Sequence, residues 1–296
     1  MDAWRNKIAL GTAQFGLDYG INNARGKISS SEVAKILDGA RNGGIDLLDT
    51  AGAYGDAEKV LGSTLGTGRR DFKIVSKIPP NATTPEDVAL SVQATLSDLD
   101  VNCLYGVLVH DISAFMRDGR NWKVLLRLQD VGTIEKVGVS AYYPKDLQEF
   151  ISSGQVPQLV QIPYNVFDRR FDSLLPTLRE LNIEVHTRSI FLQGLFFVEP
   201  DRLSSHFRSA EAKIRHLQNL AKSMDIPLSS MLLSVGLCDS RIDRVVVGVD
   251  SLANLQENLA AFDHLDCCDS LAAELRQFEE KNEDILLPFK WQKGKA

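Results

Sequence analysis

Cysteine is scarce in this chain, and its spacing excludes the common structural uses of that residue. The 296 residues include only four cysteines, Cys103, Cys238, Cys267 and Cys268, and no two of them form a Cys-x-x-Cys pair. Neighbouring cysteines such as Cys267 and Cys268 do not easily bridge to each other. We therefore expect no disulfide framework and no metal site, but reduced thiols in a cytosolic compartment.

Long apolar runs and an excess of basic residues are also missing. No stretch approaches 18 consecutive apolar residues, and the segment from Met1 to Lys7 has no apolar signal core. The 33 basic residues are scattered and are outnumbered by 39 acidic ones, which gives a net charge of −6. These absences predict a cytoplasmic protein that has neither a membrane nor a nucleic acid as its partner.

Short and nearly continuous apolar runs alternate with helical patterns along the chain. Such runs are typical of parallel strands that are buried on both faces. Eight strands, each followed by a helix, predict an α/β protein that folds as a (β/α)8 TIM barrel, with residues 1–296 in a single domain. The strands are expected at residues 8–12, 45–49, 72–77, 104–110, 136–140, 158–162, 184–188 and 244–248.

The interval after the seventh strand is about twice as long as the others. It contains two additional helical patterns, at residues 211–224 and 228–238, and a polar loop at residues 199–208 that is a plausible cover for a site. The tail from Asp269 predicts a further helix at the carboxyl end. The remaining helices are expected to start near Ser31 and Pro85 and to occupy residues 57–65, 121–131, 144–151, 173–181 and 251–262.

Three of the apolar runs are each followed by an ionisable residue, and these residues complement one another. Asp49, Lys77 and His110 end successive predicted strands, and Tyr54 follows Asp49 closely. Barrels of this kind carry their chemistry at the carboxyl ends of the strands. Tyr54 can donate a proton readily near neutral pH only if its pKa falls by about 3 units, which corresponds to roughly 4 kcal/mol. A lysine about 4 Å away can supply an interaction of that size. Asp49 would keep Lys77 charged, and His110 would orient a carbonyl oxygen.

Each of these four residues also has a simpler structural explanation. Asp49 can cap a turn, Tyr54 can be a packed loop aromatic, Lys77 can form a salt bridge at the barrel rim, and His110 can be a hydrogen-bonded core histidine. Four such coincidences on adjacent strand ends are improbable, and their joint placement favours an active site.

The same residues resemble the active-site pattern of the aldo-keto reductases, and especially of the shorter bacterial members. The pattern consists of Asp49-Thr-Ala-x-x-Tyr54-Gly, then Ser76-Lys77 and Val109-His110, and the likeness extends over nearly the whole chain. The resemblance implies hydride transfer between the C4 atom of a nicotinamide and a carbonyl carbon. It implies Tyr54 as general acid, Lys77 and Asp49 as its tuning pair, and His110 as the group that orients substrate. A Gly-x-Gly-x-x-Gly motif is absent, as a barrel that binds nicotinamide without a Rossmann fold requires.

The resemblance also implies where the cofactor lies. Ser140 and Gln161 would hydrogen-bond the carboxamide, although Ala141 stands where the family usually has asparagine. Arg188 replaces an aromatic residue that usually stacks on the nicotinamide; it can stack, hold an anionic substrate group, or form a rim salt bridge. The residues expected to hold the cofactor are Gly11, Thr12, Asp49, Ser140, Gln161, Arg188, Ser189, Phe191, Gln193, Gly194, Gly248, Ser251, Asn254, Glu257 and Asn258.

The family implies NADP(H), but the residues near the expected adenine end weaken that preference. Asn254 occupies the position of an arginine that often holds the 2′-phosphate, and Asp250 adds a negative charge that disfavours a phosphate. The same segment is also an ordinary capped helix. We therefore expect that NAD(H) is also accepted.

The substrate is expected to be a small aldehyde, ketone or sugar, and the protein to be a monomer or a weak homo-oligomer. Phe15, Tyr54, His110 and Tyr142 are expected to line the substrate pocket, although aromatic residues there also serve loop packing. Two alternatives remain open. One is an aldolase or lyase that forms a Schiff base on Lys77, and the other is a non-catalytic regulatory subunit that binds a nicotinamide cofactor.

Overall fold

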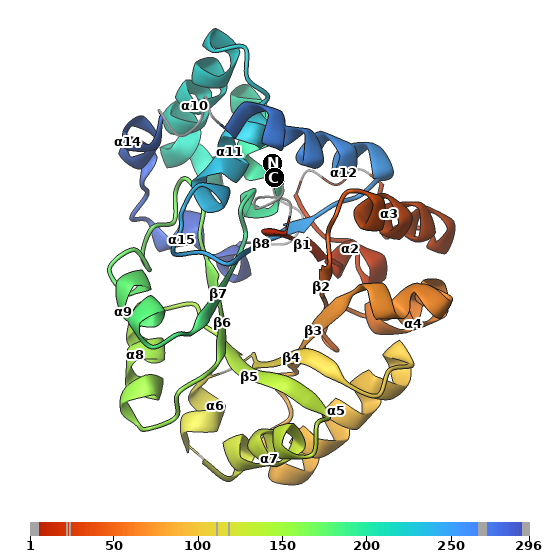
Figure 1. Ribbon diagram of the computed structural model, residues 1–296. Helices are drawn as coiled ribbons and strands as arrows, with labels where there is room; N and C mark the ends of the chain where they lie inside the picture. Colours follow the sequence, from red (N-terminus) through yellow and green to blue (C-terminus); the bar gives the residue numbers. More distant parts are fainter. Residues whose placement is uncertain are drawn as a thin grey trace.

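Eight parallel strands close into a barrel in the order of the sequence, and helices surround it (Figure 1). The computed structural model describes residues 6–21, 23, 25–110, 112–117, 119–265 and 271–291. Strand β8 pairs with β1, so the sheet has no free edge, and the predicted (β/α)8 barrel is confirmed. The strands are β1 (Ile8–Gly11), β2 (Leu47–Asp49), β3 (Lys73–Ile78), β4 (Leu104–Val109), β5 (Ile134–Ser140), β6 (Leu159–Pro163), β7 (Glu184–Arg188) and β8 (Arg244–Gly248).

The helices begin and end close to the residues that the sequence patterns indicate. Helix α5, for example, begins with a capping box, in which Thr84 accepts from the Asp87 amide and Asp87 accepts from the Thr84 amide. The α-helices are α2 (Ala13–Gly16), α3 (Ser30–Asn42), α4 (Ala57–Leu65), α5 (Pro85–Leu99), α6 (Ile112–Arg117), α7 (Gly119–Asp130), α8 (Pro144–Ser152), α9 (Leu175–Glu180), α10 (Glu211–Ser223), α11 (Leu228–Leu237), α12 (Leu252–Leu259), α14 (Ala272–Leu275) and α15 (Glu283–Leu286). Short 3-10 helices are η1 (Gly66–Asp71), η2 (Leu192–Phe197), η3 (Pro200–Arg202), η4 (Ser205–Ala210), η5 (Ala260–His264), η6 (Arg276–Phe278) and η7 (Pro288–Lys290).

The additional helices after the seventh strand are present as α10 and α11: α11 packs against β8, and α10 lies on the outer side of α11 (Figure 1). Extra helices are also present in the tail, as α14 and α15 with η6 after α14. Asp269, where the helical pattern was expected to begin, lies outside the described residues. These helices are short, since the Glu280 amide donates to the Phe167 carbonyl and Lys213 donates to the Glu279 carbonyl, so the backbone between α14 and α15 bonds to other elements.

The barrel interior is filled by side chains, so a ligand cavity can lie only at an end of the barrel. An apolar layer packs across the centre, formed by Ala9, Leu47, Val75, Leu108, Leu159 and Val246. Below it, towards the amino ends of the strands, Glu184 accepts hydrogen bonds from Tyr105 and Lys136. The carboxyl ends of the strands are thus left to shape a ligand site.

Two glycines allow the loop after β2 to pack directly on α2. A Cβ atom at Gly16 would lie 1.9 Å from the carbonyl oxygen of Tyr54, which is much closer than real Cβ contacts. Gly55 has a φ of +62°, and a Cβ atom there would lie 2.5 Å from the Gly16 carbonyl oxygen. The backbone of Tyr54 is therefore held against the loop that follows β1.

A buried carboxyl group joins α4 to the strand that carries Lys77. Glu58 is 5% exposed, and it accepts a hydrogen bond of 2.5 Å from Ser76, the residue before Lys77 in β3. Thr95 of α5 donates to both Glu58 oxygens, at 3.3 and 3.2 Å. Burial raises the pKa of Glu58, while these hydrogen bonds oppose that rise. Glu58 thereby links the Tyr54 loop, through α4, to the Lys77 strand.

Replacing Gly16 with alanine should displace the loop that carries Tyr54, because a methyl group cannot occupy the place of a carbonyl oxygen. We expect the free energy of unfolding, measured with urea, to fall by about 1–3 kcal/mol. Gly52→Ala is a matched control in the same loop, since the nearest atom to a Cβ there, Glu58 Oε2, is 3.8 Å away. Equal stability of the two variants would contradict the close packing of Gly16.

The raised pKa of Glu58 predicts a pH dependence of stability. A carboxyl group whose pKa is higher in the folded state contributes most to stability in acid, and this contribution is lost as the pH rises through its folded pKa. Glu58→Gln cannot ionise, so its melting temperature relative to the parent protein should rise between about pH 4 and pH 8. Glu86→Gln, on the exposed start of α5, should show no such trend. If the difference in melting temperature between Glu58→Gln and the parent protein stayed constant with pH, Glu58 would not titrate as inferred.

Candidate active site

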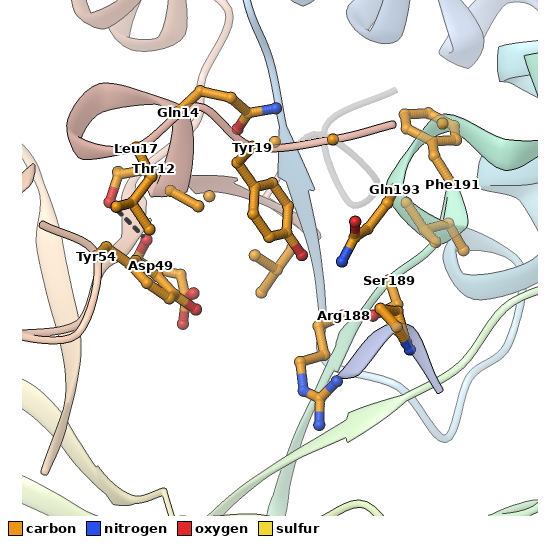
Figure 2. A pocket seen from close by; sticks show the side chains of 18 of the residues that line it. Thr12, Gln14, Leu17, Tyr19, Asp49, Tyr54, Arg188, Ser189, Phe191 and Gln193 are labelled. Carbon is orange, nitrogen blue, oxygen red and sulfur yellow. Dashed lines mark hydrogen bonds between the residues drawn. The ribbon is translucent and has the colours of Figure 1, made fainter. Parts of the chain in front are cut away.

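A cavity of about 620 Å³ opens at the carboxyl ends of the strands, and most of the predicted site residues line it. They come from distant parts of the sequence, and Figure 2 shows Thr12, Asp49 and Tyr54 on one side with Arg188, Ser189 and Gln193 on the other. The predicted residues that the cavity brings together are Gly11, Thr12, Asp49, Tyr54, Lys77, His110, Ser140, Tyr142, Gln161, Arg188, Ser189, Phe191, Gln193, Gly194, Gly248, Asn254, Glu257 and Asn258.

A buried ion pair lies at the floor of this cavity. The Lys77 ammonium donates to both carboxylate oxygens of Asp49, at 2.8 Å each, and to the Thr50 carbonyl oxygen at 3.0 Å. The two side chains are 1% and 4% exposed. Burial alone would lower the pKa of Lys77, but the carboxylate of Asp49 and the neighbouring Tyr54 outweigh it and raise that pKa. The pairing with Asp49 therefore favours the protonated form of Lys77.

Tyr54 lies over this ammonium, which is 5.0 Å from the centre of its ring. Burial raises the pKa of Tyr54; Lys77 and Arg188 lower it, and Asp49 raises it further. The net direction is upward, so the expectation that Lys77 brings the pKa of Tyr54 below its usual value is wrong for the protein alone. The reason is that Asp49 cancels much of the lysine charge while the surrounding protein withdraws the phenol from water.

His110 and Gln161 complete the floor of the cavity. His110 directly follows β4 and lines the same cavity. Gln161, in β6, donates to Asp49 Oδ1 at 2.6 Å, which fixes the orientation of its amide. The other end of that amide, Oε1, is buried and has no hydrogen-bond partner among the described residues. A buried acceptor of this kind is suited to a ligand amide that donates a hydrogen bond.

The loop after β7 forms one wall of the cavity. Ser189, Leu192, Gln193 and Gly194 all have φ values between +46° and +89°, so the chain turns sharply here. The Ile21 amide donates to the Gln193 carbonyl at 3.0 Å, and this bond ties the loop after β1 across to the loop after β7. Tyr19 enters the cavity between the two walls in the view of Figure 2. Burial of its hydroxyl raises the pKa of Tyr19 to about 12.

The far end of the cavity is polar and acidic. Asn258 is 1% exposed, and neither its Oδ1 nor its Nδ2 has a hydrogen-bond partner within the described chain. Asn254, Glu257 and Asp250 line the same end, and Ser229 donates to Glu257 at 2.9 Å. An unpartnered amide with both a donor and an acceptor is suited to the edge of a heterocyclic base.

Two of the predicted residues lie elsewhere. Phe15 is fully buried in the hydrophobic core and does not line the cavity, because helix α2 turns its ring inward between the strands and α4. Ser251 is the N-cap of α12, where its hydroxyl accepts from the Asn254 amide at 3.2 Å and donates to Asp250. The prediction that Phe15 borders a substrate is therefore wrong, and Ser251 has a structural role that accounts for it.

Several lining residues were not singled out by the sequence. Gln14 follows the Gly11-Thr12 pair and has a buried, unpartnered Oε1 facing the cavity (Figure 2). Phe289 returns from the carboxyl-terminal tail to pack edge-on against Tyr142, with ring centres 5.0 Å apart. The polar Gln14, two residues after the Gly11-Thr12 pair, was a usable signal, whereas nothing in the sequence places Phe289 near Tyr142.

Other classes of site receive no support from the described residues. No group of three or more histidine, cysteine, aspartate or glutamate side chains there is arranged to hold a metal ion. Within the same residues, none of the helices is both long and apolar enough to span a bilayer.

Comparisons with known proteins agree with the barrel fold and with the resemblance of the sequence. Residues 7–280 match the aldo/keto reductase family. An uncharacterized oxidoreductase of Bacillus subtilis, YqkF, is 25% identical over 86% of this chain and 90% of its own length. L-galactose dehydrogenase of Arabidopsis thaliana is 25% identical, with 91% of this chain and 89% of the plant protein covered. The crystal structure of an aldo-keto reductase from Klebsiella pneumoniae in complex with NADPH superposes with a TM-score of 0.71 at 21% identity, covering 93% of this chain and 92% of that one, and it shows the shared fold.

The family match covers all eight strands of the barrel and every residue of the Asp49, Tyr54, Lys77 and His110 cluster. The chain is a member of the aldo/keto reductase family of NAD(P)H-dependent oxidoreductases.

Proposed function

We propose that this enzyme transfers a hydride between a nicotinamide cofactor and the carbonyl carbon of a small aldehyde, ketone or sugar, with Tyr54 as the proton donor. The observation that carries this proposal is the position of Tyr54 over a buried ammonium inside the cavity. When a hydride is added to a carbonyl carbon, the carbonyl oxygen becomes an alkoxide, which requires a proton.

The pKa of Tyr54 is raised, so the phenol keeps its proton until the reaction, but it is also a weaker acid than a free tyrosine. Donation therefore depends on stabilisation of the phenolate that is left behind. Lys77 supplies this stabilisation, because two unit charges about 4 Å apart attract by roughly 4 kcal/mol at an effective dielectric near 20. Asp49 holds the ammonium in place, and His110, which lines the same cavity, would donate a hydrogen bond to the substrate oxygen.

The cavity fits a nicotinamide dinucleotide along its length. The unpartnered Gln161 Oε1 and the neighbouring Ser140 would hold a carboxamide, and the turn from Ser189 to Gly194 would face the phosphates. Asn258, with its unpartnered amide, would receive the adenine. Such a cofactor supplies the hydride, which no side chain can provide.

The substrate should be compact. Tyr19, Tyr142 and Phe289 line the cavity together with Tyr54, and aromatic faces of this kind favour flat or hydrophobic groups beside a polar centre. The plant relative named for L-galactose supports a sugar-sized aldehyde or its hemiacetal as one member of the substrate range.

The aldolase alternative is disfavoured by the state of Lys77. A Schiff-base lysine must lose its proton to attack a carbonyl, and the ion pair with Asp49 raises the pKa of Lys77. Borohydride added with an aldehyde should therefore leave Lys77 unmodified, and trapping of the substrate there would identify an aldolase instead.

Tyr54→Phe should reduce kcat for carbonyl reduction by roughly 10²- to 10⁴-fold, because the reaction loses its proton donor. The dissociation constant of NADPH or NADH, from quenching of protein fluorescence, should change little. Tyr143→Phe is a matched control, since its hydroxyl makes only a long contact of 3.4 Å with Glu283 and does not line the cavity. Turnover that survives in Tyr54→Phe would show that another group delivers the proton, and a panel of small aldehydes that are not reduced at all would favour a regulatory protein.

The acidic end of the cavity predicts weak discrimination between the two nicotinamide cofactors. Asp250 and Glu257 oppose a 2′-phosphate, and Asn254 offers no charge to hold one, although the family and the NADPH complex of the bacterial relative favour NADP(H). We expect kcat/KM for NADPH and NADH to agree within about tenfold. Asn254→Arg should raise the preference for NADPH by roughly 10- to 100-fold through a charge-assisted hydrogen bond, whereas Asn254→Gln should not. A thousandfold preference of the parent enzyme for NADPH would refute this expectation.

A further inference from the structure

Arg188 places a positive charge inside the cavity that nothing else in the described structure neutralises. It stands at the carboxyl end of β7 and lines the cavity beside Tyr54 and Tyr142. Its guanidinium lies 4.1 Å from the centre of the Tyr142 ring, so stacking fixes its plane. Its Nη2 atom is buried and has no hydrogen-bond partner among the described residues.

The other charges of the cavity do not balance it. Lys77 and Asp49 cancel each other through their two hydrogen bonds. The remaining lining carboxylates, Asp250 and Glu257, belong to the segment from β8 to α12, and neither forms an ion pair with Arg188 among the described residues. The end where the reaction would occur therefore carries one uncompensated cation.

The guanidinium is close enough to influence the reacting group. Its charge lowers the pKa of both Tyr54 and Tyr19, against the stronger effect of their burial. A buried donor without an acceptor costs about 1–3 kcal/mol, and more when it is charged. This cost is recovered when a ligand supplies an anionic acceptor, and a guanidinium fork matches the two oxygens of a carboxylate or a phosphate.

We propose that Arg188 binds an oxyanion of the substrate, and that the preferred substrates are small carbonyl compounds that carry a carboxylate or a phosphate a few atoms from the carbonyl. This inference rests on the proposed function of the same cavity and specifies its substrate class. Tyr142 and Phe289 support the guanidinium from one side, and Tyr19 faces it across the cavity, so the anion is held beside aromatic surfaces rather than in open solvent.

The test compares two aldehydes of nearly the same shape, 4-carboxybenzaldehyde and its neutral methyl ester. The parent enzyme should show a higher kcat/KM for the carboxylate. In Arg188→Gln the ratio of kcat/KM for the acid over that for the ester should fall by roughly 10- to 100-fold, mainly through KM, because a charged hydrogen bond is lost. Arg188→Lys should keep part of this ratio. Glyceraldehyde 3-phosphate compared with glyceraldehyde distinguishes phosphate from carboxylate recognition.

Arg179→Gln is the matched control, because it removes one arginine charge from α9, outside the cavity, and should leave the ratio unchanged. An equal loss for the acid and the ester in Arg188→Gln would overturn the proposal and assign Arg188 to the cofactor. A parent enzyme that prefers the ester would overturn it as well.

A binding measurement separates this proposal from the proposed reaction. The alcohol 4-(hydroxymethyl)benzoate, added with NADPH or NADH, should raise the melting temperature of the parent protein but not that of Arg188→Gln. If no aldehyde is reduced and this shift still occurs, the reaction has been misassigned while the anion site stands. If aldehydes are reduced and the shift is the same in both proteins, the anion site is wrong while the reaction stands.

Discussion

The structure of the candidate active site depends on one buried ion pair. Lys77 and Asp49 lie almost entirely out of water, where each charge alone would be strongly unfavourable. Their pairing is supported at both ends: the Thr50 carbonyl accepts from the ammonium, and Gln161 donates to the carboxylate. Strands β2, β3 and β6 are thereby joined through side chains in addition to the sheet. A charge that is held so firmly can act on a neighbouring phenol without rearranging during the reaction.

The phenol is positioned by backbone packing more than by its own side chain. Gly16 and Gly55 bring the loop after β2 into direct contact with α2, and Glu58 joins the following helix to β3. Burial raises the pKa of Tyr54 and keeps its proton in place, whereas the ammonium beneath it lowers that pKa and would stabilise a phenolate. The two effects oppose each other, and the ammonium offsets part of the cost that burial adds to proton donation.

The cavity has opposite charges at its two ends. Arg188 provides a cation near Tyr54, whereas Asp250 and Glu257 are at the end near α12. A dinucleotide lying between them would meet neutral amides at both its nicotinamide and its adenine, because Gln161 and Asn258 each keep an unpartnered polar atom. The charge of Arg188 would thus influence which substrate binds, and the charges of Asp250 and Glu257 would influence whether the phosphorylated form of the cofactor binds.

The sequence by itself determined the barrel, the order of its strands and the cluster at their carboxyl ends. All eight strands lie within about two residues of their predicted positions, since strands buried on both faces must be apolar runs and little else in a chain has that pattern. Asp49, Tyr54, Lys77 and His110 were found because polar residues directly after such runs all lie at one end of a barrel. The tertiary structure alone decided that Phe15 enters the core, that Phe289 reaches Tyr142, that Glu58 links α4 to β3, and that the pKa of Tyr54 rises rather than falls. These outcomes depend on which way side chains turn and how far they are withdrawn from water, and both are set by packing between segments that are distant in the sequence.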